Sequence, residues 1–175
     1  MTSTSVIELL ELLDSEGIEV WLDGGWGVDA LLQAQTRPHK DVDIIVRLSE
    51  VSRLSGCLAS RGFTVRPGGT LSSFVLVNPA GLEIDVHAVT FDERGDGVYR
   101  MANGQVWIYP AGGFLGQGSI AGVPVRCLSP EVQVLGHAHG YVPTEKDIGD
   151  MENLRSRFGV ELPPHLRRVA KSRQT

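Results

Sequence analysis

The chain has 175 residues and a mass of 18.9 kDa, which is the size of one domain with at most a short appendage. Its apolar fraction of 42% is typical of a folded globular protein, and no stretch approaches the roughly 18–20 apolar residues that cross a membrane. The net charge of -5 argues against a dedicated nucleic-acid binder, whose domain is usually basic. Two isolated cysteines are too few for a disulfide framework, so a cytoplasmic location is expected.

The first half of the chain is predicted to alternate between helices and strands. Val6, Leu9, Leu10 and Leu13 have the spacing of an amphipathic helix, which Gly17 ends. The elements expected after it are a strand over 18–22, a tight turn at 23–25, a helix over 26–33, a strand over 41–47, a helix from an N-cap at Ser49 to Ala59, and strands over 63–65, 72–77 and 82–89.

The second half is glycine-rich before it becomes helical. Residues 91–123 predict loops and hairpins over one face of the sheet, with a β-like piece around 106–109 and any linker near 112–122. A last strand is expected over 123–128. Ser129 followed by Pro130 is a typical helix start. The helices expected from there are 131–139, 144–158 and 164–171, so the pattern indicates an α+β fold.

Asp41 and Asp43 are the first candidates for chemistry. Residues two apart on a strand share a face about 6.5 Å apart, so the two carboxylates project together. If the later strand lies beside this one, Glu83, Asp85 and His87 join the same side. Crowded acids resist ionisation unless a cation neutralises them, and oxygen ligands favour a hard cation such as Mg²⁺. The alternative is that these acids face solvent on an uncovered sheet.

Gly24 and Gly25 lie between a predicted strand and a predicted helix. Glycines let the backbone approach phosphate oxygens closely, and the free amides of the first helical turn offer donors and a favourable dipole. Two glycines alone could simply make a turn. Followed by an acidic pair, they indicate a joint site for a nucleotide's phosphates and a metal ion.

Two stretches of sequence carry a family resemblance. Residues 21–31, WLDGGWGVDAL, and residues 36–44, TRPHKDVDI, resemble the signature of the small aminoglycoside and lincosamide nucleotidyltransferases, which belong to the polymerase β-like nucleotidyltransferase superfamily. The resemblance continues through 122–127 and 146–150. It implies a mixed sheet with packed helices. It makes residues 1–128 the expected catalytic domain and residues 129–175 a C-terminal helical region packed on it.

The resemblance also implies roles for the site residues. In that superfamily a glycine turn holds the triphosphate, which assigns nucleotide binding to Gly24 and Gly25. An Asp-x-Asp pair binds the metal ions, which assigns that role to Asp41 and Asp43. A third carboxylate comes from a later strand, and Asp85 fits that position as a general base, as a metal ligand, or as both.

Two cations are further candidates for the nucleotide site. Arg37 precedes the acidic pair and matches the family's Thr-Arg-x-His sequence; it could meet phosphate or brace the loop through a carboxylate. Lys146, at a predicted helix start, could reach the β- or γ-phosphate or remain a surface residue.

Candidates for the acceptor site are less specific. Glu83 and His87 share the predicted acidic face, and Tyr141 could line an acceptor pocket together with Trp107 and Tyr109, although each aromatic residue could instead pack in the core or in a hairpin. The acids that could attract a polyamine sugar are Glu83, Asp85, Asp92, Glu93 and Asp96.

The expected activity is Mg²⁺-dependent transfer of a nucleoside monophosphate, AMP from ATP, to a hydroxyl of an aminoglycoside-like or lincosamide-like antibiotic, with release of pyrophosphate. The expected partners are a nucleoside triphosphate and a small hydroxylated acceptor, with neither a membrane nor nucleic acid. One alternative is a nucleotidyltransferase toxin that modifies tRNA, against which the net charge counts. Another is a non-catalytic nucleotide-binding module, against which the three carboxylates count. A homodimer that completes the acceptor pocket is left open, because the chain has little room for an acceptor domain.

Overall fold

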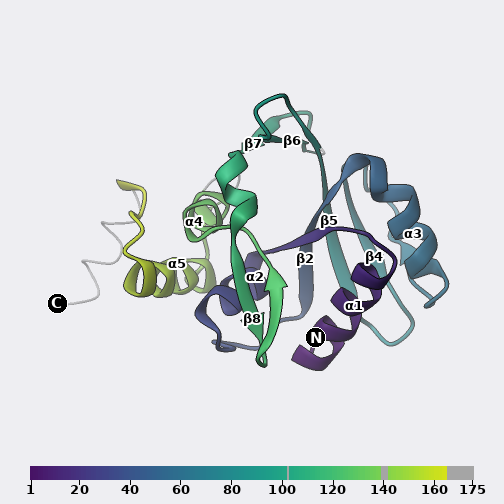
Figure 1. The fold of residues 1–175 in the computed structure, drawn as a ribbon, viewed down its shortest axis with the longest axis horizontal. Helices are drawn as coiled ribbons and strands as arrows, with labels where there is room; N and C mark the ends of the chain where they lie inside the picture. The colour runs from purple at the N-terminus through teal and green to yellow at the C-terminus, as the bar shows by residue number, and fades with distance from the viewer. Residues whose placement is uncertain (102, 139–141, 165–175) are drawn as a thin grey trace.

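The computed structural model describes residues 1–101, 103–138 and 142–164. In these residues seven strands form one mixed sheet in the order β1-β2-β5-β4-β3, to which β6 and β7 are added at β5 (Figure 1). The strands are β1 (Val20–Asp23), β2 (Asp41–Arg47), β3 (Thr64–Val65), β4 (Ser73–Val77), β5 (Glu83–Phe91), β6 (Gly97–Arg100) and β7 (Val106–Tyr109), and a separate hairpin pairs β8 (Gln117–Ile120) with β9 (Val123–Arg126). Strands β2 and β5 run parallel, whereas β1 and β4 pair with them antiparallel.

Helices surround this sheet. Figure 1 shows α4 and α5 together at one end of the molecule and α3 at the other. The helices are α1 (Ser3–Ser15), α2 (Gly24–Leu32), α3 (Val51–Ala59), α4 (Pro130–Ala138) and α5 (Glu145–Phe158), with 3₁₀ turns η1 (Leu48–Glu50) and η2 (Ala111–Leu115). No helix in the described residues is long and apolar enough to cross a membrane.

The two faces of the central strands differ, as the alternation in the sequence predicts. Val42, Ile44 and Val46 of β2 and the matching apolar residues of β5 are buried in the main hydrophobic core, which includes residues from all five helices. The opposite face carries the acidic residues. The helical packing on one face thus leaves the other available for a site.

Two predicted helix starts are wrong in detail. Helix α2 begins at Gly24, directly after β1, so Gly24 and Gly25 belong to its first turn, here called the glycine turn, and Asp23 is its N-cap. Ser49 lies inside η1 and is not the N-cap of α3, which begins at Val51 without a side-chain cap. The 3₁₀ turn places the first α-helical residue two positions beyond the expected cap.

The glycine-rich middle of the chain is more ordered than expected. The β6–β7 hairpin extends the sheet, pairing with Val89–Phe91 beyond the residues of β5 that pair with β4. Residues 112–122, the expected linker, belong to η2, to β8 and to the turn that follows. Strand β8 packs on α2 so closely that a Cβ on Gly118 would meet the Ala30 backbone.

The predicted helices 131–139 and 144–158 correspond to α4 and α5. Asp147 accepts hydrogen bonds from the backbone N–H and the hydroxyl of Thr144 at the start of α5, and Gly159 ends the helix in a left-handed conformation. Both helices contact α2 and each other. The predicted helix 164–171 lies almost entirely outside the described residues.

Candidate active site

A cavity of about 730 Å³ opens on the acidic face of the sheet. Its walls come from the junction of β1 and α2, from residues 37–43, from β4, β5 and the β6–β7 hairpin, and from α4 and the start of α5. This volume lies within the range of small-molecule sites in proteins. Gly24, Gly25, Arg37 and Lys146, which the sequence assigns to nucleotide binding, all line the cavity.

The register of β2 and β5 brings the predicted acids together. Asp41 lies opposite Glu83, and Asp43 lies opposite Asp85. Ligand atoms of Asp43, Asp85 and His87 all lie within 4.8 Å of one another. Asp41 lines the cavity but is not a member of that group. The sequence placed His87 on this acidic face and assigned it to the acceptor, and in the structure it lies beside the carboxylates.

Burial and charge alter the proton affinities of this group. Burial raises the pKa of Asp43 to about 7, and the negative charges of Asp23, Asp85 and Asp41 reinforce this shift while the charge of His87 opposes it. Burial lowers the pKa of His87, but its hydrogen bond with Asp85 and the nearby carboxylates outweigh that effect and raise it to about 9. A bound cation would relieve the repulsion among these carboxylates.

Close contacts at Gly24 and Gly25 leave no room for a side chain. Gly24 has φ of +57°, and a Cβ there would lie 2.8 Å from Asp43 Cγ, so a side chain would displace the carboxylate. A Cβ on Gly25 would lie 2.7 Å from Arg37 Nη2. The backbone N–H of Gly24 donates to Asp23 Oδ1 over 2.8 Å. The turn therefore lies directly between the acidic group and the Arg37 guanidinium.

Arg37 makes the contact to a carboxylate that the sequence left open. Its Nη2 donates to Asp150 Oδ2 of α5 over 2.7 Å. Its Nη1 lies 3.0 Å from Nδ1 of His39. Arg37 lines the cavity as well, so bracing the loop and facing a ligand are compatible.

The wall of the cavity that the β6–β7 region forms is aromatic. Tyr99, Met101, Trp107 and Tyr109 of the β6–β7 region line it. The His87 and Tyr99 rings stack with centroids 5.1 Å apart and an interplanar angle of 11°. Trp107 and Tyr109, for which hairpin packing was the alternative, thus line the cavity from within the hairpin.

Acids that the sequence offers for the acceptor site are paired with cations in the structure. Glu83 is not among the residues that line the cavity; its carboxylate pairs with Arg66 at 2.7 Å and Lys40 at 3.8 Å. Asp92 and Asp96 are not among them either; both pair with Arg94 at the β5–β6 turn. Tyr141 lies outside the described residues.

Several wall residues were missed by the sequence reasoning, namely Asp23, Ser73, Tyr99, Met101 and Asn103. An Asp directly before two glycines is a typical helix N-cap and could have indicated Asp23. The other four have no local signal. The pairing of β4 with β5 brings Ser73 to the site, and the pairing of the β6–β7 hairpin with β5 brings Tyr99, Met101 and Asn103.

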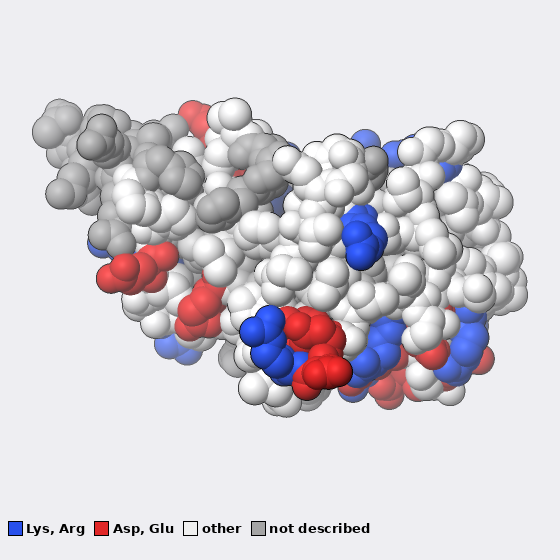
Figure 2. Space-filling model, turned by 90° about the horizontal axis from the view of Figure 1, so that it is seen from above, with Lys and Arg blue, Asp and Glu red and all other residues white. Residues whose placement is uncertain are grey.

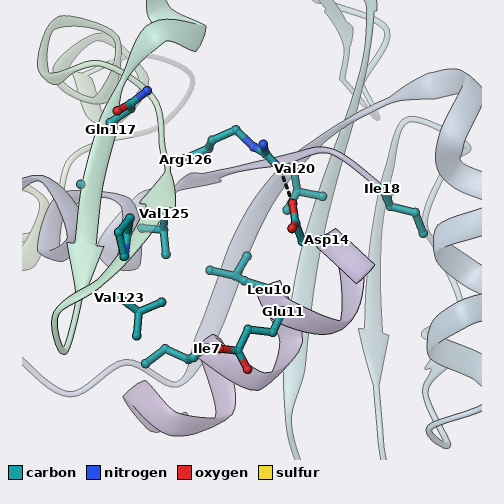
Figure 3. Close-up of a pocket in the computed structure, with 12 residues that line it drawn as sticks. Ile7, Leu10, Glu11, Asp14, Ile18, Val20, Gln117, Val123, Val125 and Arg126 are labelled. Carbon is teal, nitrogen blue, oxygen red and sulfur yellow. Dashed lines mark hydrogen bonds and ion pairs between the residues drawn. The ribbon is translucent and has the colours of Figure 1, made fainter. Parts of the chain in front are cut away.

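A second cavity, of about 350 Å³, lies between α1 and the β8–β9 hairpin (Figure 3). Its lining is mainly aliphatic, and its Arg126 pairs with Asp14 at 3.1 Å. It has no group of carboxylates and imidazoles comparable to that in the larger cavity. The chemistry that the sequence predicts therefore belongs to the larger cavity.

Known proteins resemble this chain over most of its length. A family model described as aminoglycoside-2''-adenylyltransferase matches residues 5–154. The chain belongs to this family. Membership of the aminoglycoside-2''-adenylyltransferase family makes the chain a nucleotidyltransferase, which confirms the enzyme class predicted from the sequence.

Individual relatives of the family cover much of the chain. It is 28% identical over 156 residues to a lincosamide resistance protein from Staphylococcus haemolyticus, a match that covers 89% of this chain and 96% of that protein. It is 28% identical over 138 residues to a 2''-aminoglycoside nucleotidyltransferase from Klebsiella pneumoniae, covering 73% of this chain and 68% of that protein.

Solved structures confirm the predicted nucleotidyltransferase fold. The lincosamide antibiotic adenylyltransferase LnuA, bound to lincomycin, has a TM-score of 0.77 and 28% identity, covering 89% of this chain and 98% of its own. The structure of ANT(2'')-Ia in complex with adenylyl-2''-tobramycin has a TM-score of 0.75 and 24% identity, covering 99% of this chain and 98% of its own, and supports the fold alone.

Proposed function

We propose that this protein transfers AMP from ATP to a hydroxyl of a lincosamide-like antibiotic in a Mg²⁺-dependent reaction that releases pyrophosphate. The observation that carries the proposal is one cavity lined by the glycine turn, by Asp41, Asp43 and His87, and by an aromatic wall, with Asp85 beside Asp43 and His87. The relatives named for lincosamide resistance and lincosamide adenylyl transfer support it.

The donor set suits a divalent cation. Asp43 and Asp85 offer carboxylate oxygens close together, and Asp41 projects from the same face. The raised pKa of Asp43 means that, without a metal ion, nearby positive charge does not fully balance the negative charge of its carboxylate. Bound Mg²⁺ would supply neutralisation of the phosphate charge. Asp41, Asp43 and Asp85 are the residues that would hold it.

The reaction asks little covalent chemistry of the protein. The acceptor oxygen forms a bond to the α-phosphorus, the bond from that phosphorus to the bridging oxygen breaks, and pyrophosphate leaves. The acceptor proton needs a base, and we assign this role to Asp85, with its carboxylate 3.5 Å from Nε2 of His87. Gly25 offers its backbone amide to the triphosphate, Gly24 leaves the approach free of a side chain while its own N–H donates to Asp23, and Arg37 and Lys146 line the same cavity.

The cavity walls favour a lincosamide over an aminoglycoside. An aminoglycoside is a polycation, and acids on the acceptor side would be needed to bind its amines. Asp92 and Asp96 are paired with Arg94 at the β5–β6 turn, and Glu83 is paired with Arg66. The β6–β7 wall of the cavity is instead aromatic, which suits an acceptor with a hydrocarbon portion and a sugar ring.

The alternatives have less support. A tRNA-modifying enzyme would need a basic surface for the phosphate backbone. On the face shown in Figure 2, acidic and basic side chains are mixed along one margin and the middle is largely uncharged. A non-catalytic module would not need the adjacent carboxylates of Asp43 and Asp85. We retain as proposals a catalytic domain over 1–128, a helical region over 129–175, a cytoplasmic location and a homodimer that completes the acceptor pocket.

The test is a matrix of nucleoside triphosphates against lincosamides and aminoglycosides with Mg²⁺, followed by pyrophosphate release and product mass. We expect ATP with a lincosamide to give a product heavier by one adenylyl group. Transfer only to aminoglycosides would overturn the acceptor assignment. Transfer to tRNA alone would favour the toxin alternative.

A further inference from the structure

A network of buried polar groups joins α2, the loop after it and α5. Asp29 of α2, His39 and Asp150 of α5 are each less than a tenth exposed, and Arg37 connects the two ends of the network. Arg37 Nη2 donates to Asp150 Oδ2 over 2.7 Å, and Arg37 Nε lies 3.4 Å from the other oxygen. This two-pronged contact fixes the plane of the guanidinium as well as its position.

The chemistry of arginine fixes the direction of these hydrogen bonds. A guanidinium has only donors, so His39 Nδ1 accepts from Arg37 Nη1 and carries no proton. His39 Nε2 then donates to Asp29 Oδ2. The other Asp29 oxygen accepts from the backbone N–H and the hydroxyl of Thr36, at 3.0 and 2.7 Å. Arg37 is therefore held from two sides by groups that are themselves fixed.

The guanidinium that this network holds lies against the glycine turn. A Cβ on Gly25 would be 2.7 Å from Arg37 Nη2, and Arg37 lines the same cavity as Asp43. A guanidinium has five N–H donors, of which three are directed at Asp150 and His39. The remaining two have no hydrogen-bonding partner in the part of the chain that the structure describes, so a ligand in the cavity can accept from them.

We propose that Asp150, which does not itself line the cavity, is a positioning residue that holds Arg37 against the Gly24–Gly25 turn and aims its guanidinium at the triphosphate of the nucleotide. This inference rests on the proposed function and extends it to a residue of α5. A guanidinium fixed in advance binds phosphate without the entropy cost of ordering a long side chain. The triphosphate thus gains a rigid cationic partner beside the turn amides.

The test uses Asp150→Asn, which keeps the shape of the side chain and removes its charge. Dissociation constants for ATP and for adenosine are measured by equilibrium titration with Mg²⁺ on the full chain. We expect ATP affinity to fall about 10- to 100-fold, the range for a lost charged hydrogen bond, with adenosine affinity unchanged. Arg37→Lys should give a similar loss. The double variant should lose little more, because the two residues act as one unit.

Asp14→Asn is the matched control. It also removes an Asp–Arg pair, to Arg126 at 3.1 Å, but at the second cavity (Figure 3). It should leave both affinities unchanged. If Asp150→Asn fails to fold in thermal unfolding, Arg37→Lys must still show a loss confined to ATP.

The possible outcomes separate this role from the proposed function. Equal ATP affinity in wild type and Asp150→Asn overturns the positioning role and leaves the function intact. Parallel loss of ATP and adenosine affinity also overturns it, because that result indicates general disruption. A wild-type protein that binds no ATP overturns the proposed function itself.

Discussion

At Asp43, burial and the neighbouring carboxylates outweigh the opposing charge of His87 and raise the pKa. The side chain is enclosed between the glycine turn and β5, and the Asp23, Asp41 and Asp85 carboxylates add repulsion. Asp43 therefore binds a proton more tightly in the folded protein than in the unfolded chain. His87 also binds its proton more tightly when folded, because Asp85 accepts a hydrogen bond from it.

These shifts predict that the metal-free protein loses stability as pH rises from about 4 to 9. For Asp43 the pKa rises from 3.8 to about 7, so ionisation over that interval destabilises the fold. For His87 the pKa rises from 6.5 to about 9, so its stabilising contribution is complete below 6.5 and is lost as pH passes through 9. Thermal unfolding in EDTA across this range measures the effect.

Asp43→Asn is the informative variant for this prediction. It should be at least as stable as wild type at pH 8 without metal, with a weaker pH dependence, since the buried charge is gone. It should also lose transfer activity. Wild-type stability that is flat with pH, or near-normal transfer by Asp43→Asn at saturating Mg²⁺, would contradict our account of the acidic group.

Asp85 gives a second prediction at this scale. If it is the general base, Asp85→Asn should lower the rate roughly 10²- to 10⁴-fold while Mg²⁺ and ATP affinities barely change, and the acidic limb of the pH–rate profile should disappear. Turnover and equilibrium titration measure the two parts. If the variant instead needs more Mg²⁺ and excess metal restores its rate, Asp85 is a metal ligand. A wild-type rate would exclude both roles.

Among the elements, β2 and β5 were predictable because local alternation determines which face each side chain takes. The Val42/Ile44/Val46 face and the acidic face follow from a period of two. The β6–β7 hairpin was not predictable in this way, because its position depends on pairing with Val89–Phe91 and its own sequence is glycine-rich. Helix α2 was predicted two residues late because a glycine at positive φ does not look like a helix start.

We predict that replacing Gly24, at the junction of β1 and α2, is far more damaging to stability and activity than replacing Gly56 in α3. Gly24→Ala places a Cβ at φ +57° against the Asp43 carboxylate, so we expect a loss of about 1–2 kcal/mol in unfolding free energy and a severe loss of activity. Gly56→Ala in α3 meets nothing within 4 Å and should be neutral or stabilise by up to about 1 kcal/mol. Chemical denaturation compares them. Equal effects of the two substitutions on stability would contradict the close approach of Gly24 to Asp43.

We predict that the β6–β7 hairpin contributes to binding of the acceptor and not of ATP. Trp107 lines the cavity, whereas Ile108 on the opposite face of the same strand is 45% exposed. Trp107→Ala should raise KM for the acceptor about 10-fold or more and leave KM for ATP unchanged, because the lost surface belongs to the aromatic wall. Ile108→Ala, the matched control, should change neither constant. A rise in KM for ATP alone would place the nucleotide at this wall.

At the scale of the whole molecule, the cavity depends on segments from both ends of the chain. The acids come from the central sheet, whereas Lys146 and Asp147 come from the start of α5. Core residues of α4 and α5 belong to the same hydrophobic cluster as those of β2 and β5. The start of α5 therefore contributes to the same cavity as the acidic residues of the central sheet.

Because the acids and the cations of the nucleotide site line one cavity, we predict that ATP and Mg²⁺ bind with positive coupling. The acids repel one another and the triphosphate unless a cation lies between them, so each ligand should strengthen the other by the same factor. Calorimetric titration of ATP with and without Mg²⁺, and of Mg²⁺ with and without ATP, measures both sides of this cycle. Thermal stabilisation should likewise exceed the sum of the separate effects.

Asp43→Asn provides the control for coupling, because it removes one carboxylate from the group of Asp43, Asp85 and His87 while keeping the cavity walls. We expect this variant to bind ATP with much less dependence on Mg²⁺. Equal ATP affinity in wild type with and without Mg²⁺ would count against a metal shared by protein and nucleotide. It would favour a module that binds nucleotide through the glycine turn and its cations alone, without transferring it.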